Sequence, residues 1–174
     1  MPRLTADFYR QPSPALAPLL LGKFLCRKTK QRTLRARITE TEAYYGEKDT
    51  ACHARHGRTP RTDIMYAEGG RAYIYLCYGM HDMLNIVSGD KDFPEAVLIR
   101  GIEGLHGPGK LTRHLGITRA LNAECLVTSA RLWLEDDGTA LPYTATPRIG
   151  IPYASPRDRR RPWRFLACQG CVTP

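Results

Sequence analysis

Strand-like segments dominate the first hundred residues and constrain the fold more than any other feature of the chain. Residues 23–29 and 34–44 read as two strands joined across a short polar turn. Residues 71–89 read as two further strands on either side of a tight turn near Gly79, and the apolar run at 95–101 indicates a buried strand. Many strands with few helices between them predict an α+β fold, largely an antiparallel β-sheet with a few short helices.

The other segments are shorter and less regular. Residues 45–62 lack periodicity and carry Gly, Pro and basic side chains, which is typical of a functional loop. A short helix is expected over residues 13–22, with Ser13 as its N-cap and Gly22 at its end. Further helices are expected at 107–116 and 118–125, and further strands at 130–136, 147–151 and 163–168. With 174 residues and no repeats or long linkers, we expect one domain spanning residues 1–174.

The chain is strongly basic. It carries 26 Lys and Arg residues against 17 Asp and Glu residues, which gives a formal net charge of +9. Twenty of these cations are arginines, whose planar guanidinium groups favour bidentate contacts with phosphate. Nucleic acid is therefore the first partner to consider. An anionic membrane is less favoured, because the sequence has no basic amphipathic helix.

No segment is typical of a membrane span or a secretion signal. Apolar runs fall short of the roughly 18 residues that a membrane-spanning helix needs. The apolar segment 15–25 is interrupted by Pro18 and Gly22 and lacks a small-residue cleavage site. We therefore expect no membrane association. The expected location is the cytoplasm, at the nucleoid of a bacterium, or the nucleus of a eukaryote.

Six cysteines are scattered along the chain, which predicts free thiols in a reducing compartment. Cys168 and Cys171 have the spacing of a metal or redox motif, and residues 52–56, "CHARH", contain further potential ligands. Isolated half-motifs of this kind are usually accidental, so we expect no metal site.

The segment "RITETEAYYG", residues 37–46, carries two glutamates two positions apart in a basic chain. On a strand, Ile38, Glu40, Glu42 and Tyr44 would share one face, with the two carboxylates roughly 7 Å apart. In a pocket, burial and mutual repulsion would raise at least one pKa, which suits a general base. The alternative is an exposed strand whose glutamates pair with arginine or lysine. Alternation does not choose between Glu40 and Glu42.

Several familiar chemistries are not supported. Residues 104–111 approximate a phosphate-binding loop, but Leu111 replaces the Ser or Thr that would contact magnesium, and Pro108 removes a backbone donor. Lys110 is instead expected to contact DNA phosphate at a helix start. The zinc-deaminase motif and the Gly-x-Ser-x-Gly nucleophile motif are absent. A metal-dependent nuclease built on Glu40 and Glu42 stays a weak alternative, because no acidic ligand motif is evident.

The remaining parts are a carboxylate, several aromatic side chains and a basic loop, which suit an enzyme that acts on a base turned out of DNA. Seven segments, in order along the chain, resemble the alkyladenine (3-methyladenine, methylpurine) DNA glycosylase family. They are "RITETEAYYG", "HARHGRTPRT", "YIYLCYGMHDMLNIV", "AVLIRG", "GPGKLTRHLGI", "RIGI" and "PWRF". Together they extend from about Leu16 to Phe165, almost the whole chain.

The resemblance implies roles for individual residues. It identifies Glu42 as the base that deprotonates the water attacking the sugar carbon, with Arg100 near that water and the flipped nucleotide. It also implies that Tyr78 is the side chain wedged into the duplex, in agreement with its position beside Gly79. Glu40 would then support the site by pairing with an arginine.

The base pocket follows from the same resemblance. Aromatic residues that stack the flipped purine correspond to Tyr44, His53 and Tyr75, and Asn85 corresponds to the asparagine that disfavours the exocyclic amino group of guanine. On chemistry alone these side chains could equally be core or satisfied polar residues. Arg58, Arg61 and Lys110 are the expected contacts to the DNA backbone.

The predicted activity is a monofunctional glycosylase that leaves an abasic site without cutting the strand, because no lysine is placed for Schiff-base attack. The resemblance implies no cofactor and no metal, and the expected partner of the monomer is double-stranded DNA containing damaged purines. Two regions depart from the family: the short segment 102–106 and the Arg-rich insert 152–162. The main alternative from another class is a non-catalytic nucleic-acid-binding module, which would have no need of a water-activating base.

Overall fold

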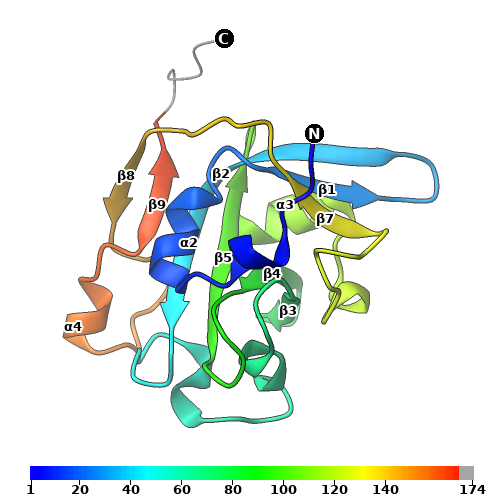
Figure 1. Ribbon diagram of the computed structural model, residues 1–174. Coiled ribbons are helices and arrows are strands. Elements are labelled where there is room, and N and C mark those ends of the chain that lie inside the picture. The colour runs from blue at the N-terminus through cyan, green and yellow to red at the C-terminus, as the bar shows by residue number, and fades with distance from the viewer. Residues whose placement is uncertain (169–174) are drawn as a thin grey trace.

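The computed structural model describes residues 1–168 and confirms an α+β fold built on one antiparallel sheet (Figure 1). Six strands lie in the order β3-β4-β5-β2-β1-β7, while β6 pairs with β5, β9 pairs with β2, and β8 pairs with β9. The strands are β1 (Phe24–Lys28), β2 (Thr33–Tyr45), β3 (Ala72–Cys77), β4 (His81–Val87), β5 (Glu95–Ile102), β6 (Leu105–His106), β7 (Leu132–Glu135), β8 (Tyr143–Thr146) and β9 (Arg164–Ala167).

Four short α-helices accompany this sheet in the described part of the chain: α1 (Ala6–Tyr9), α2 (Ser13–Leu19), α3 (Pro108–Leu115) and α4 (Pro156–Arg159). Single 3-10 turns lie at His53–His56, Asp63–Tyr66 and Arg119–Leu121. None of the helices in residues 1–168 is long and apolar enough to cross a membrane.

Strand β2 is the centre of the sheet. Its sequence is rich in Thr, Tyr and Ile, residues that favour extended backbone. Its first half pairs with β1, and its second half lies between β5 on one side and β9 on the other. Both glutamates of the predicted site are in that second half, so they lie in the interior of the sheet.

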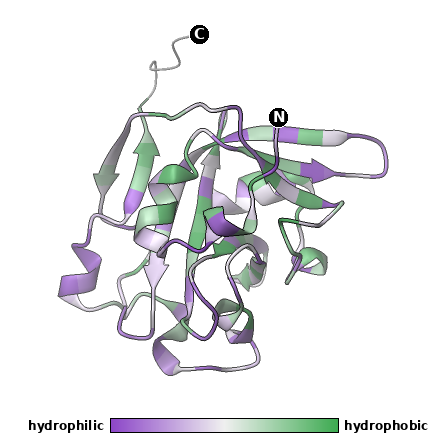
Figure 2. Ribbon diagram, viewed as in Figure 1, coloured by the Kyte–Doolittle hydropathy of each residue, from purple (hydrophilic) through white to green (hydrophobic). Residues whose placement is uncertain are grey.

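The core occupies one face of the sheet. Helix α2 lies across β2 and β5 (Figure 1), and the Thr41 hydroxyl donates a 2.8 Å hydrogen bond to the Ala17 carbonyl. Ala43 and Ile99 are fully buried in the same cluster. Much of α2 and β5 is coloured as hydrophobic, whereas α4 at the lower left is hydrophilic (Figure 2). The residues that alternate with this core set point to the opposite face of the sheet.

The expected alternation along β2 is interrupted by a bulge. The register between β2 and β5 shifts on either side of Glu40, which pairs with Gly101 and leaves Arg100 outside the ladder. A bulge of this kind moves the following side chains to the other face. Ile38 therefore packs in the same core as Ala43, and the prediction that it shares a face with Glu40 and Glu42 is wrong.

Two further expectations were wrong, and four helices and strands were missed. Residues 118–125 form only the turn Arg119–Leu121, because Asn122 is extended and its side chain accepts a 2.8 Å hydrogen bond from the Ile74 N–H. Residues 147–151 form no strand. Strands β6 and β8 and helices α1 and α4 had not been expected. The helices predicted over 13–22 and 107–116 are present as α2 and α3, with Pro12 rather than Ser13 as the N-cap of α2.

Candidate active site

A row of directly opposed residues crosses four strands on the face away from α2. Leu98 of β5 is paired with Glu42 of β2 on one side and with Asn85 of β4 on the other. Asn85 is paired in turn with Tyr73 of β3. Because directly opposed residues share a face of the sheet, this row brings a carboxylate, an amide and a phenol to one side.

A cavity of about 480 Å³ opens over this row. Its volume lies in the range of small-molecule pockets. Every residue predicted for the base pocket lines it, together with Arg100 and the hairpin residue Tyr78: Tyr44, His53, Tyr75 and Asn85. The sequence-based grouping of these side chains around one pocket is therefore present in the fold.

Glu42 lies behind the wall of this cavity and is fully buried. Its Oε2 accepts a 2.8 Å hydrogen bond from the Tyr44 hydroxyl, and its Oε1 accepts one of 2.8 Å from the Ile149 N–H. The Arg100 Nε lies 3.5 Å from Oε1. Burial raises the pKa of Glu42, and Arg100 and the two donors oppose that rise. A carboxylate that holds a proton more readily than usual suits a general base.

Glu40 is also buried, and its carboxylate pairs with two arginines. Its Oε1 lies 3.0 Å from the Arg100 Nε and 2.7 Å from the Arg164 Nε. The expectation that Glu40 pairs with an arginine agrees with this geometry, while the alternative of an exposed strand is wrong. Arg100 contacts both glutamates, so Glu40 fixes the guanidinium that lies beside Glu42.

The aromatic wall is a packed group on β3 and on the loop between β2 and β3. The His53 ring is edge-on to Tyr75, with centroids 4.5 Å apart, and its Nδ1 lies 2.9 Å from the Tyr73 hydroxyl. The Arg61 guanidinium lies 5.1 Å from the Tyr75 ring centroid. Burial first, and then the charges of Arg61 and Arg55, lower the pKa of His53 to about 4. His53 is therefore a neutral wall residue at physiological pH.

Asn85 is held by backbone groups of the hairpin. Its Nδ2 donates to the Tyr73 carbonyl at 3.2 Å and to the Met83 carbonyl at 3.4 Å. Only 4% of the residue is exposed. The side chain is thus fixed in orientation, because the two carbonyls that accept its hydrogen bonds belong to the strands that frame the cavity.

The β3–β4 hairpin ends in an exposed tip at the edge of the cavity. Tyr78 is 86% exposed and Met80 is 68% exposed, and the turn is closed by the Met80 N–H on the Cys77 carbonyl at 3.1 Å. Tyr78 and Gly79 both have positive φ, 49° and 69°. This left-handed backbone turns the chain sharply and costs a tyrosine more than a glycine. Tyr78 therefore lies at the hairpin tip, as the sequence predicts.

Helix α3 supports the hairpin from below. A Cβ on Gly109 would lie 2.8 Å from the His81 ring, so the helix approaches β4 more closely than a larger residue allows. The Thr112 hydroxyl donates a 2.7 Å hydrogen bond to the Asp82 carbonyl. These contacts fix the base of the hairpin, whereas its tip is exposed to solvent.

The predicted backbone contacts differ in their surroundings. Arg58 pairs with Asp63 at 2.7 Å and with Asp92 at 3.3 Å. Arg61 lines the cavity, while Lys110 is exposed in the first turn of α3. Lys110 and Arg61 are therefore more available than Arg58 for contacts with phosphate groups.

The Arg-rich insert is anchored to the fold by one carboxylate. Asp158 is fully buried, and its Oδ2 accepts a 2.6 Å hydrogen bond from the Thr50 hydroxyl. Arg157 and Arg161 lie 3.3 Å and 2.9 Å from its Oδ1. The insert is therefore a fixed part of the surface next to the loop that follows β2.

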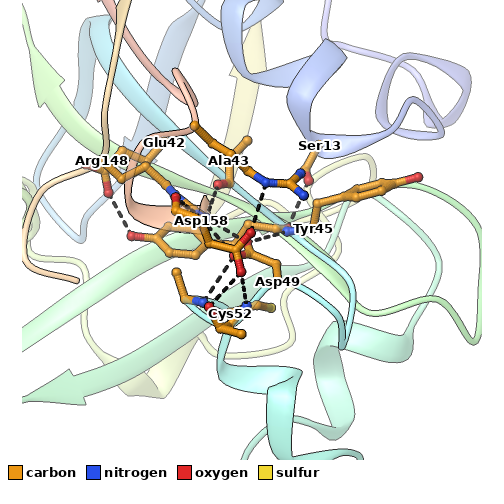
Figure 3. Close-up of polar contacts among 12 residues, drawn as sticks. Ser13, Glu42, Ala43, Tyr45, Asp49, Cys52, Arg148 and Asp158 are labelled. Atoms are coloured by element: carbon orange, nitrogen blue, oxygen red, sulfur yellow. Dashed lines mark hydrogen bonds and ion pairs between the residues drawn. The ribbon is translucent and has the colours of Figure 1, made fainter. Parts of the chain in front are cut away.

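Sequence reasoning missed a buried ion pair beside the cavity. Arg148 and Asp49 are joined by two hydrogen bonds of 2.6 and 2.9 Å (Figure 3). The aromatic Tyr153, which also lines the cavity, was missed as well. Arg148 lies in the segment 147–151, which was predicted to be a strand. An arginine within this apolar segment was the only feature of the sequence that could have indicated the ion pair.

The described residues contain no group of three or more His, Cys, Asp and Glu side chains placed to hold a metal ion. Burial raises the pKa of the Cys52 thiol to about 12, so it is a poor thiolate ligand. Of the "CQGC" motif, Cys171 lies outside the described residues.

The chain is similar in sequence to a known protein family and to several named proteins. Residues 7–107 and 103–170 match a family model described as Methylpurine-DNA glycosylase (MPG), and the two matches meet at the short segment that departs from the family. Three similar proteins carry the name "Putative 3-methyladenine DNA glycosylase". The one from Psychrobacter cryohalolentis is 46% identical over 85% of this chain and 84% of its own length. Those from Methanocella arvoryzae and Borrelia garinii subsp. bavariensis are each 43% identical, over 95% and 91% of this chain and 92% of their own lengths.

Proposed function

The chain belongs to the methylpurine-DNA glycosylase family, and from its site we propose that it excises alkylated or deaminated purines from duplex DNA. Family membership supports a DNA glycosylase that acts in DNA repair. The observation that carries the finer proposal is Glu42, a buried carboxylate of raised pKa at the wall of an aromatic-lined cavity.

In the proposed reaction, Glu42 accepts a proton from a water molecule as the water oxygen bonds to the sugar carbon C1′. The bond between C1′ and the purine nitrogen breaks, and its electron pair leaves with the base. An alkylated purine carries positive charge on its ring, so it leaves as a neutral molecule without further protonation. Hypoxanthine is neutral in DNA, so it leaves as an anion and takes up a proton from solvent water. Arg100 lies 3.5 Å from the Glu42 carboxylate and favours the ionised form that accepts the proton.

The cavity suits a cationic base. A purine between Tyr44, His53 and Tyr75 stacks on aromatic faces, and a positively charged ring gains a cation–π attraction of roughly 0.5–2 kcal/mol there. His53 has a pKa of about 4 and is neutral, so it does not repel the charge of an alkylated purine. Asn85 is fixed by two carbonyls and is the proposed discriminator against the exocyclic amino group of guanine.

Base flipping is assigned to the hairpin tip. Tyr78 is the proposed wedge, since an exposed aromatic side chain on a well-supported turn can fill the space that the flipped base leaves. Lys110, Arg61 and Arg58 are the proposed contacts to phosphates. No lysine is among the described side chains that line the cavity, which supports a monofunctional enzyme acting through water.

The test is release of free base from a methylated duplex and from a duplex with a single hypoxanthine, with EDTA present. Chromatography measures the base, and alkali treatment reveals abasic sites. We expect release by the wild type, loss of at least 1,000-fold in Glu42→Gln, and strand breaks only after alkali. Glu103→Gln, the same change at an exposed position, is the control.

Two outcomes would overturn the proposal. Tight, salt-sensitive binding without release from either substrate would favour a non-catalytic binding module. Strand cleavage that EDTA abolishes would favour a metal-dependent nuclease.

A further inference from the structure

Arg148 and Asp49 form an ion pair that is closed to solvent, with side chains 0% and 1% exposed. The pair is bidentate and joins two loops that are 99 residues apart in the sequence (Figure 3). Burying two charges costs free energy that their attraction only partly offsets, so such a pair is weak evidence for a role in stability alone. Arg148 also donates a 3.2 Å hydrogen bond to the Asp158 carbonyl and lies 5.1 Å from the Trp163 ring centroid, and its remaining contacts lead to the candidate active site.

Arg148 fixes the end of strand β2. Its guanidinium donates a 2.9 Å hydrogen bond to the carbonyl of Ala43, the residue between Glu42 and Tyr44. The same group lies 4.9 Å from the centroid of the Tyr44 ring. One side chain therefore contacts both the backbone of Ala43, next to Glu42, and the ring of Tyr44, whose hydroxyl donates to Glu42.

Arg148 also determines where the next residue lies. The Ile149 N–H donates a 2.8 Å hydrogen bond to Glu42 Oε1, although residues 147–151 form no regular secondary structure. Without a sheet ladder, this segment is anchored by two buried side chains, those of Arg148 and Ile151. Both donors on the Glu42 carboxylate, the Tyr44 hydroxyl and the Ile149 N–H, are thus held by the same guanidinium.

Asp49 extends the arrangement to the loop that carries His53. Its Oδ1 accepts a 3.1 Å hydrogen bond from the Ala51 N–H, and its Oδ2 accepts one of 3.2 Å from the Tyr45 N–H. Tyr45 ends β2, and Ala51 lies two residues before His53. The carboxylate therefore ties the cavity wall to the same strand that carries Glu42.

We propose that Arg148, held by Asp49, is a positioning residue that orients Glu42 and the Tyr44 ring for water activation. It acts through the Tyr44 hydroxyl and the Ile149 N–H and does not contact the substrate. The inference rests on the proposed role of Glu42 as general base.

The charged and titratable groups around Glu42 define the expected pH effect: Tyr44 and Glu40 on β2, Arg100 on β5, Arg164 opposite Glu42 on β9, and Arg148. Among them, Arg100 and Arg148 lower the pKa of Glu42 by their positive charge. Removing the charge of Arg148 therefore raises that pKa, and the acid limb of the reaction moves to higher pH.

Two variants separate geometry from charge. Arg148→Lys keeps the charge but loses the bidentate fork. The double variant Arg148→Met, Asp49→Leu removes both charges together and leaves no uncompensated ion in the interior. Arg159→Met, at an exposed arginine of α4, is the control.

The measurements are the single-turnover rate of hypoxanthine release from pH 4.5 to 9, the melting temperature, and an NMR titration of the Glu42 carboxyl carbon. We expect both variants to fold and to lose about tenfold or more in rate at pH 7, with little change in duplex affinity. The acid limb and the NMR titration should move upward in the double variant and stay near the wild-type position in Arg148→Lys.

A lowered melting temperature with unchanged rate and unchanged Glu42 titration would overturn the inference, and so would loss of folding in both variants. An inactive wild type would instead contradict the proposed function. In that case the Glu42 titration still decides whether Arg148 positions the carboxylate.

Discussion

The Tyr44 hydroxyl donates a 2.8 Å hydrogen bond to Oε2 of Glu42, two residues earlier on the same strand. Burial, and then the neighbouring Glu42 carboxylate, raise the pKa of Tyr44 well above its ordinary value, so the phenol stays protonated and acts as a donor. The ring that lines the cavity is therefore coupled to the carboxylate behind it. In the proposed function, a purine stacked on Tyr44 would contact the side chain whose hydroxyl donates to Glu42, the proposed general base.

Tyr44→Phe tests this coupling because it keeps the ring and removes the donor. The lost hydrogen bond stabilised the ionised form of Glu42, so its pKa rises and the acid limb of base release moves to higher pH. The rate at pH 7 should fall about tenfold, as expected for a lost bond of roughly 1–1.5 kcal/mol. Single-turnover pH profiles measure both effects. Tyr143→Phe, at an exposed tyrosine, should leave the profile in place.

Glu42→Gln should make the protein more stable at pH 7 and not at pH 4. The pKa of Glu42 is higher in the folded than in the unfolded chain, so its ionisation favours unfolding. This destabilising contribution is absent below the unfolded-state pKa and fully present above the folded-state pKa. Urea unfolding at the two pH values measures the difference. A less stable variant at pH 7 would mean that the attraction to Arg100 outweighs the burial of the charge.

His53 should remain neutral well below its usual titration range. Its pKa is about 4 in the folded protein, whereas the unfolded chain takes up this proton near pH 6.5. Stability should therefore fall as the pH drops from about 6.5 towards 4, and less so in His53→Phe. Ring-carbon NMR shifts of His53 should be constant between pH 5.5 and 8. A His53 transition near pH 6.5 would contradict the prediction.

Tyr78→Ala should reduce base release from duplex DNA without affecting folding. The side chain is 86% exposed, so its truncation should change stability by no more than about 0.5 kcal/mol. Loss of the wedge should lower the rate on duplex substrate and have less effect on single strands, where no stacked gap has to be filled. Met80→Ala, at the neighbouring exposed tip position, is the matched control. Equal losses on both substrates would argue against a wedge.

Lys110→Ala should weaken DNA binding more than Arg58→Ala does. Lys110 is exposed on α3, whereas Arg58 is neutralised by Asp63 and Asp92. Loss of one phosphate contact reduces the slope of log affinity against log salt by about 0.9. Titration of a fluorescent duplex at several salt concentrations measures this slope. A larger change in Arg58→Ala would show that DNA displaces the two carboxylates.

Much of the site followed from local patterns in the sequence. The β-branched and aromatic residues of 34–44 predicted β2, and the glycine after Tyr78 predicted the hairpin tip. Strand alternation placed Glu40 and Glu42 on one face, and family resemblance selected Glu42 as the base. These features depend on neighbouring residues, so a linear pattern is enough to indicate them.

The rest depends on partners that are distant along the chain. The bulge at Arg100 arises from pairing between β2 and β5, so the sequence of β2 alone could not reveal that Ile38 turns to the core. Arg148 and Asp49 are 99 positions apart in the sequence, so only the folded chain brings them together. The helix expected at 118–125 stops because Asn122 bonds to the backbone of β3, a contact that no local propensity contains.

Side chains along β2 and β5 alternate between the core and the cavity, and this limits where residues can be inserted into the chain or deleted from it. Inserting or deleting one residue within β2, just before Thr41, would exchange the two faces and place Thr41 in the cavity and Glu42 against α2. Length variation in these strands is therefore incompatible with activity, whereas the loops between strands can absorb it. Arg100 of β5 and Thr39 of β2 both lie outside the ladder and offset each other, so Ile38–Ile102 and Thr41–Ile99 keep one register, and removing either residue alone would shift one half of the pairing relative to the other.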